Sequence, residues 1–159
     1  MERRLRKMIG HGAIVTILGL VAGFGIVTSL IGGFEIWPGY IIEFTTPGDS
    51  AAWARAHAGG LMNGILIFVG AMLLHTMNAP EGLSKHIPWM LIAMGYANTA
   101  FYWFGMFATN RALSFGDNPI GEANLAGFLG FFPAFVMAFV TIVAMGMLAR
   151  YAFSQNDDI

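Results

Sequence analysis

The sequence contains no cysteine and few charged residues. Of its 159 residues only 11% are Asp, Glu, Lys or Arg, whereas a soluble domain usually carries about 25%. The absence of cysteine excludes disulfides, thiolate metal sites, cysteine nucleophiles and covalently attached c-type haem. The net charge of -1 gives no indication of nucleic-acid binding, and we expect none.

Apolar residues are abundant, at 57% of the chain, and the mean hydropathy is +0.66. They gather in four long runs, 9–31, 57–77, 87–107 and 125–153. Each run reaches the roughly 20 residues that a helix needs to cross the apolar part of a bilayer. The sequence therefore predicts an all-α fold, with residues 1–159 forming a single integral membrane domain of four transmembrane helices.

The positive charges are distributed unevenly around these spans. Arg55 and Arg111 lie near the first and third connections, and the other six of the eight Lys and Arg residues lie before the first span, between the second and third, or at the end of the fourth. Positive residues favour the cytoplasmic side, so both termini are predicted to be cytoplasmic. Loops 34–56 and 108–124 then face outward. Loop 34–56 is apolar, and we expect it to lie on the membrane surface or to fold back over the bundle.

Polar residues interrupt the second and third spans. The stretch WARAHAGGLMNG (53–64) brings His57 and Asn63 into the second span, and Asn98 and Tyr102 share one face of the third. With a rise of about 1.5 Å per residue, all four lie in the outer half of the membrane. Polar groups at one depth in a membrane predict a functional site. Two other interpretations stay open: His57 bonds a carbonyl at a helix start, and Asn98 makes an interhelical hydrogen bond.

Two glycines lie on the same face of the second span as His57. Gly60 and Gly64 follow the histidine by three and seven residues. They would leave clearance for a broad planar ligand below the imidazole. Haem suits such a place, because one histidine can hold its iron and leave the opposite face open. Glycines in this position equally suit close helix packing.

Four motifs along the chain have a specific resemblance. GGFEIWPGYIIEF, WARAHAGGLMNG, NTAFYWF and TNRALSFGDN, in this order and spacing, resemble the styrene oxide isomerase family over nearly the whole chain. The resemblance implies a small four-helix membrane enzyme that assembles as a homotrimer and binds haem b. It implies conversion of aryl epoxides to aldehydes by a Meinwald rearrangement, with ferric haem b as the Lewis acid. It further implies a location in the bacterial inner membrane among lipid, and a functional link to an epoxide-forming monooxygenase.

The resemblance also assigns roles to residues. It implies that His57 is the axial ligand of the haem iron, and that Asn63 and Tyr102 line the open face where the epoxide lies. Asn98 is a candidate neighbour of this site because it lies four residues before Tyr102. Arg55 and Arg111 are candidate partners of the haem propionates. Three carboxylates are equally available to these arginines: Glu35, Glu43 and Asp117.

Two other functions are consistent with a membrane bundle. A b-type cytochrome anchor for electron transfer needs two histidines at one depth, and His11 and His75 both lie toward the cytoplasmic end. A transporter or channel subunit needs a water-lined path, for which the spans carry few polar residues. The isomerase is the function that the motifs favour.

Overall fold

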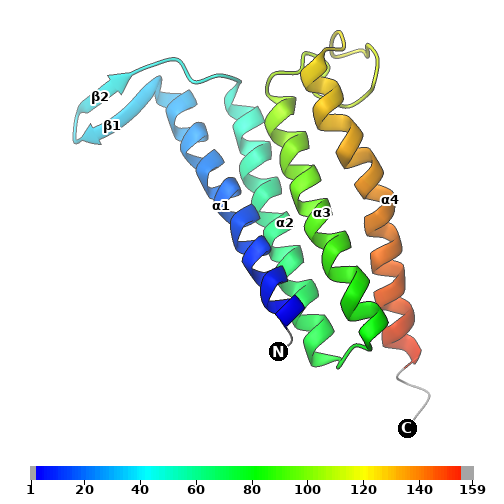
Figure 1. Cartoon of the computed structure of the whole chain (residues 1–159). Helices are drawn as coiled ribbons and strands as arrows, with labels where there is room; N and C mark the ends of the chain where they lie inside the picture. Colours follow the sequence, from blue (N-terminus) through cyan, green and yellow to red (C-terminus); the bar gives the residue numbers. More distant parts are fainter. Residues whose placement is uncertain (1–2, 155–159) are drawn as a thin grey trace.

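A computed structural model describes residues 3–154 of the chain. Four long helices make up most of it, and a two-stranded hairpin follows the first (Figure 1). The elements in chain order are α1 (Arg3–Ile31), β1 (Gly33–Trp37), β2 (Tyr40–Glu43), α2 (Ser50–Thr76), α3 (Glu81–Gly105) and α4 (Leu125–Ser154). The helices lie side by side in chain order, and both chain ends lie at the same end of the bundle (Figure 1).

Three of the helices are long and apolar enough to cross a membrane: α1, α2 and α4. The third helix begins at Glu81, six residues before the apolar run from which a span was predicted. It therefore includes Lys85 and His86, which had been expected in a loop. A membrane-spanning α3 thus stays a prediction, while the helical bundle itself is confirmed.

The hairpin corrects the expectation of an all-α fold. Its strands pair antiparallel, with Gly33 opposite Glu43, and Pro38-Gly39 supplies the turn. Gly39 has φ +82°, the conformation that a type II turn requires after proline. The hairpin projects away from the helices, so the expectation that this loop folds back over the bundle is wrong (Figure 1). Its place on a membrane surface stays a prediction.

Helices α1 and α2 approach each other through glycine. A Cβ atom added to Gly60 would lie 2.5 Å from the Cα of Gly19, so the two backbones are in direct contact. One to two turns away, a Cβ on Gly64 would meet Thr16 and the carbonyl of Gly12. Small residues permit this close approach, which is a common means of helix association in membranes. The contacts fix which residues of the two helices lie at one level.

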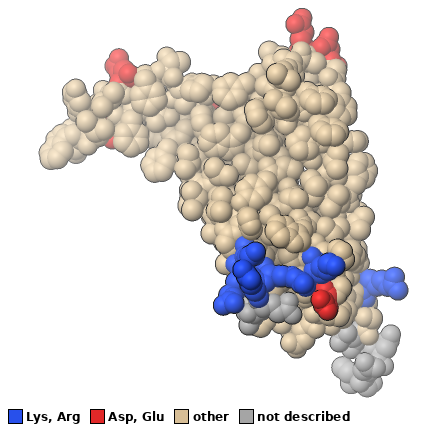
Figure 2. Space-filling view, viewed as in Figure 1, with Lys and Arg blue, Asp and Glu red and all other residues tan. Residues whose placement is uncertain are grey.

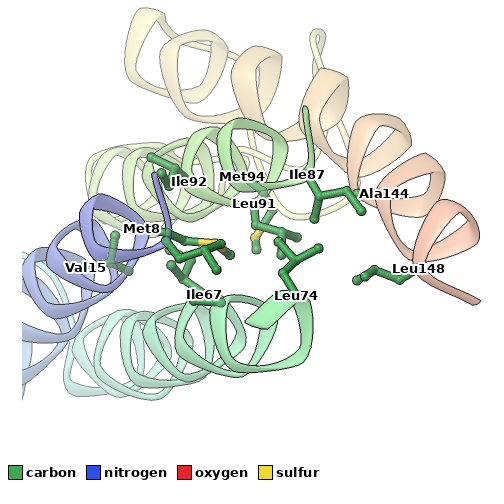
Figure 3. Close-up of a cluster of buried hydrophobic side chains, with 12 residues drawn as sticks. Met8, Val15, Ile67, Leu74, Ile87, Leu91, Ile92, Met94, Ala144 and Leu148 are labelled. Atoms are coloured by element: carbon green, nitrogen blue, oxygen red, sulfur yellow. The ribbon is translucent and has the colours of Figure 1, made fainter. Parts of the chain in front are cut away.

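The buried side chains form two clusters. The larger lies toward the end of the bundle that holds the chain termini and draws on all four helices, including Met8, Ile67, Leu91 and Leu148 (Figure 3). The smaller lies toward the other end and contains Ala22, Trp53 and Ala56. The indole of Trp53 donates to the carbonyl of Pro47 over 2.8 Å, which ties the loop before α2 to the bundle.

Lysine and arginine gather at the end of the bundle where the chain termini lie (Figure 2). The opposite end shows acidic residues in this view. The side of the molecule between these ends is almost free of charge, which suits a bundle surrounded by lipid.

Candidate functional site

His57 lies about two turns into α2 and faces α1. Asp49 caps the N-terminus of α2, its carboxylate accepting from the amide of Ala52, so the helix begins seven residues before the apolar run 57–77 from which it was predicted. The His57 Nδ1 atom is 2.9 Å from the Gly19 carbonyl oxygen. A carbonyl accepts only, so Nδ1 carries the proton and Nε2 keeps its lone pair. The half-buried imidazole is thus held in the tautomer that ligates metals through Nε2.

Gly23 makes room for this imidazole. A Cβ atom at Gly23 would lie 3.0 Å from the Nδ1 atom of His57 and 3.2 Å from its Cε1 atom. Gly19 and Gly23 therefore act together. Gly19 offers its carbonyl oxygen to the imidazole, and Gly23, which has no side chain, leaves room for the imidazole beside α1. The interpretation of His57 as a histidine bonded to a carbonyl is confirmed, and it is compatible with a ligand role for Nε2.

Gly60 and Gly64 lie against α1. The space where their side chains would be is filled by Gly19, Thr16 and the Gly12 carbonyl. The clearance for a planar ligand that these glycines were expected to leave is not found within this chain, because α1 occupies it. Their geometry supports the packing interpretation instead.

Asn63 and Asn98 are in direct contact between α2 and α3. The Asn98 Nδ2 atom donates to Asn63 Oδ1 over 3.1 Å, so the interhelical hydrogen bond is confirmed. Asn98 Nδ2 also lies 3.3 Å from the sulfur of Met94. Asn63 is only 8% exposed, and its own Nδ2 is buried with no partner among residues 3–154. A buried donor of this kind costs about 1–3 kcal/mol, which a ligand acceptor would offset.

A cavity of about 470 Å³ lies beside these two amides. In the described part of the chain α4 packs against α3 and makes no comparable contact with α2, which leaves a groove between the three helices. The groove is lined mainly by apolar side chains: Asn63, Leu66, Met94, Asn98, Ala138, Thr141, Ile142 and Met145. An apolar cavity with a few polar groups is the usual form of a small-molecule site.

Tyr102 lies about one turn beyond Asn98 on α3. Its ring packs on Gly59, where a Cβ atom would come within 2.1 Å of the Tyr102 Cε2 atom. The side chain is half-buried, and its hydroxyl makes no hydrogen bond to any of residues 3–154. The phenol is therefore free to donate to a ligand.

Tyr102 also lines a smaller cavity with the two outer arginines. This cavity has a volume of about 160 Å³, and Arg55, Tyr102 and Arg111 lie around it with Phe101, Gly105 and Leu113. Among the described residues neither arginine forms an ion pair. The carboxylates of Glu35 and Asp117 instead accept backbone amides, from Gly39 and Ala123 respectively. Two unpaired guanidinium groups at one cavity suit an anionic group.

The loop between α3 and α4 positions Arg111. Asn110 is fully buried, and its side chain accepts from the Ala112 amide and donates to the carbonyls of Ser114 and Gly116. Asn118 in turn donates to the Asn110 carbonyl. These bonds hold Arg111 in the left-handed region, with φ +56°. The loop is thus a folded unit, although no periodic pattern in its sequence indicates one.

The predicted site residues lie on two faces of α2. His57 faces α1, whereas Asn63 contacts Asn98 on α3 and Tyr102 packs against the α3-facing side of α2. The structure therefore places all three on the α3 side of α2, where Asn63 and Asn98 line one cavity and Tyr102 lines another, and it does not bring His57 to them within one chain. The structural roles of Gly19, Gly23 and Gly59 were missed, because a glycine that accepts a ring looks the same in sequence as any packing glycine.

His11 and His75 do not lie at one level. The contacts of Gly12 with Ile67 and of Gly19 with Gly60 place His75 beside the first turns of α1. This is about 10 Å along the axis from His11, at 1.5 Å per residue. The Nδ1 atom of His11 instead lies 2.9 Å from the Tyr96 hydroxyl. The geometry does not support a haem held between these two histidines.

A family model and a curated relative that match this chain carry the same description. The sequence profile of the family described as styrene oxide isomerase matches residues 4–153. A protein of Pseudomonas fluorescens named styrene-oxide isomerase is 40% identical over 144 residues, which cover 91% of this chain and 83% of the relative. The match includes α1 to α4 and all the site residues described above. The chain therefore belongs to the styrene oxide isomerase family.

Proposed function

We propose that the protein is a membrane enzyme that isomerises aryl epoxides such as styrene oxide to aldehydes such as phenylacetaldehyde, with ferric haem b held by His57. Family membership supports the reaction class. The observation that carries the haem is the hydrogen bond from His57 Nδ1 to the Gly19 carbonyl, which leaves Nε2 as a free ligand atom. Ligating histidines almost always have such a partner on their other ring nitrogen.

The donor set fits haem. One oriented imidazole would hold the iron, and the two unpaired arginines at the Tyr102 cavity would meet the propionates. Bound haem would supply a Lewis-acidic ferric iron to the epoxide oxygen. Asn98 contributes by holding Asn63. In the described residues Gly60 and Gly64 serve the scaffold that positions His57 rather than the haem itself.

The reaction is an internal rearrangement. The benzylic C–O bond breaks, a hydride moves from the adjacent carbon to the benzylic carbon, and the remaining C–O bond becomes the carbonyl. No atom is gained or lost and no net redox change occurs. The protein therefore needs no acid, base or nucleophile of the usual hydrolytic kind, and none of its described helices brings together a cluster of His, Asp and Glu.

Tyr102 and Asn63 act on the substrate in this proposal. Breaking the C–O bond leaves negative charge on oxygen, and the unpaired Tyr102 hydroxyl would donate to it. A preorganised donor of this kind contributes about 3–4 kcal/mol to the transition state. The unsatisfied Nδ2 of Asn63 would orient the epoxide. The surrounding apolar side chains would exclude water, which otherwise traps the benzylic cation as a diol.

A homotrimer would complete the site. The His57 face and the face that carries Asn63 and Tyr102 lie on different sides of α2. Packing the first face of one protomer near the second face of its neighbour would bring them together, and a repeated head-to-tail contact of this kind closes into a ring. The incomplete site within one chain is the observation that supports the trimer.

The charge distribution supports an orientation in the membrane, and the chemistry of the epoxide supports its route of entry and its source. Lys and Arg gather at the end of the bundle with both termini, which supports cytoplasmic termini in a bacterial inner membrane (Figure 2). An apolar epoxide partitions into lipid and would enter laterally through the groove beside α4. Aryl epoxides arise by oxygen transfer to an alkene, so an epoxide-forming monooxygenase is the proposed functional partner.

The test is the absorption spectrum of detergent-purified protein and its activity on styrene oxide. We expect a high-spin, five-coordinate ferric haem that is lost in His57→Ala and kept in His75→Ala, which removes an exposed histidine from the same helix. Phenylacetaldehyde should form with wild type and His75→Ala but not with His57→Ala. Protein from haem-replete cells that lacks haem, or a haem spectrum that survives His57→Ala, would contradict the proposal.

A further inference from the structure

A second cavity lies at the opposite end of the bundle from the arginines of the proposed site. It has a volume of about 360 Å³ and lies between the start of α1 and the first turns of α3. Three cationic side chains line one wall, and three apolar residues line the other: Arg3, Arg4 and Lys7, then Pro88, Trp89 and Ile92. It lies among the Lys and Arg residues that gather at this end (Figure 2).

Two of the three cations have no partner within the described chain. Residues 3–154 contain a single ion pair, from Arg4 to Glu81, with 3.9 Å between Arg4 Nη2 and Glu81 Oε1. The Glu81 side chain is 85% exposed, so this is a weak surface pair. Arg3 and Lys7 line the cavity without an acidic partner among these residues. An anionic ligand would give these cations a partner.

The apolar wall distinguishes this cavity from a site for a soluble anion. Trp89 is 57% exposed, and its ring lies 6.3 Å from that of His11. Tryptophan is enriched at the membrane–water interface, so an exposed indole here suits contact with lipid. Ile14 continues the apolar surface two turns beyond Lys7 on the same face of α1 and is 47% exposed. The cations and the apolar path together match a phosphate headgroup followed by an acyl chain.

We propose that this cavity is a binding site for an anionic phospholipid. Arg3, Arg4 and Lys7 contact the headgroup phosphate, and the first part of an acyl chain lies along Trp89 and Ile92. Basic pockets between helices at the cytoplasmic side of a membrane are a known form of lipid recognition. The proposal concerns a site separate from His57 and Tyr102, and it does not depend on haem or on the isomerase reaction.

The experiment uses tryptophan fluorescence of the full chain in detergent. Phosphatidylglycerol or phosphatidylcholine with brominated acyl chains is titrated into separate samples, and the quenching of Trp emission is recorded. We expect phosphatidylglycerol to quench at a concentration at least tenfold lower than phosphatidylcholine. Comparing the two lipids cancels the quenching of other exposed tryptophans such as Trp37. In Trp89→Phe the quenching component that prefers phosphatidylglycerol should disappear.

Matched charge variants locate the binding. Each charge removed, in Arg3→Gln and in Lys7→Gln, should reduce the preference for phosphatidylglycerol by about fivefold. Arg6→Gln removes the same charge from the same turn of α1 but does not line the cavity, and it should keep the preference. Circular dichroism confirms that the variants are folded.

Three results would overturn the proposal. One is equal quenching by the two lipids in wild type. Another is an equal loss of preference in Arg6→Gln and Lys7→Gln, which would mean general attraction to a charged surface. The third is reversal of the quenching by inorganic phosphate at constant ionic strength and at the lipid's own concentration, which would make the cavity a site for free phosphate.

Discussion

Replacing Gly60 by alanine tests the contact that holds α1 and α2 together. The added Cβ would lie 2.5 Å from the Gly19 Cα atom and 2.9 Å from its nitrogen. Carbon atoms in contact normally lie about 3.5–4.0 Å apart. Both neighbours are backbone atoms and cannot turn aside, so the two helices must separate by about 1 Å or more.

The separation has two energetic consequences. Overpacking at a fixed backbone contact costs about 1–3 kcal/mol. The hydrogen bond from His57 to the Gly19 carbonyl is 2.9 Å long, and lengthening it by the same amount breaks it. That loss adds about 0.5–1.5 kcal/mol. The higher helix propensity of alanine offsets about 1 kcal/mol, so Gly60→Ala should lower the free energy of unfolding by about 0.5–3.5 kcal/mol.

The matched control is Gly10→Ala. Gly10 lies within α1, and a Cβ atom there meets nothing within 4 Å. The substitution should leave the protein unchanged or stabilise it by up to about 1 kcal/mol. The free energies of unfolding are compared by circular dichroism during denaturation of the purified proteins in the same detergent. Haem absorbance is recorded in parallel, and if His57 holds haem as proposed, Gly60→Ala should retain less of it because His57 loses its orienting partner.

Equal stability of Gly60→Ala and Gly10→Ala would refute the direct backbone contact. A stability loss without any change in haem content would refute the link between this contact and His57, while leaving the packing argument intact.

Tyr102→Phe should slow the turnover of styrene oxide by about one to three orders of magnitude and leave the denaturation midpoint unchanged, because the Tyr102 hydroxyl has no partner within the described chain; a rate within twofold of wild type would rule out its role as a donor. Asn98→Ala leaves Asn63 Oδ1 without its donor and should lower the free energy of unfolding by about 1–2 kcal/mol, measured as above, and an unchanged midpoint would contradict the importance of the 3.1 Å bond. Equal coexpression of His57→Ala and Tyr102→Phe should restore activity at about a quarter of the interfaces if neighbouring protomers share the site; mixtures no more active than either variant alone would place the whole site in one chain.

The sequence predicted the helices well because their apolar runs are long. The start of α2 at Ser50 lies seven residues before the predicted span, because Asp49 caps the helix ahead of its most apolar part. The hairpin 33–43 was not foreseen, because apolar residues such as Phe34, Trp37 and Ile41 occur on both of its faces, which obscures the alternation that marks a half-buried strand. Its Pro38-Gly39 turn was the available signal.

The candidate site was predicted in part. Helical rise placed Asn63 and Asn98 at similar depth, and an interhelical hydrogen bond was one interpretation of Asn98; the structure shows that its partner is Asn63. The direction of His57 was not predictable from depth, because spacing along one helix says nothing about which neighbour each face meets. The direction of the His57 side chain is set by the packing of α1 against the glycine face of α2. This packing depends on the register between the two helices. The buried Asn110 that orders the last loop was missed because asparagine is common in any loop.

The partner of His57 has a further consequence for mutagenesis. The acceptor is a main-chain oxygen, which also accepts the amide of Gly23 within α1 and has a second lone pair for the imidazole. No side-chain replacement deletes this oxygen, so a scan of polar residues would leave the tautomer of His57 untouched and assign it no partner. An ester in place of the peptide bond that follows Gly19 weakens the carbonyl as an acceptor while keeping every side chain. That backbone substitution is the direct way to ask how much the orientation of a single imidazole contributes to catalysis.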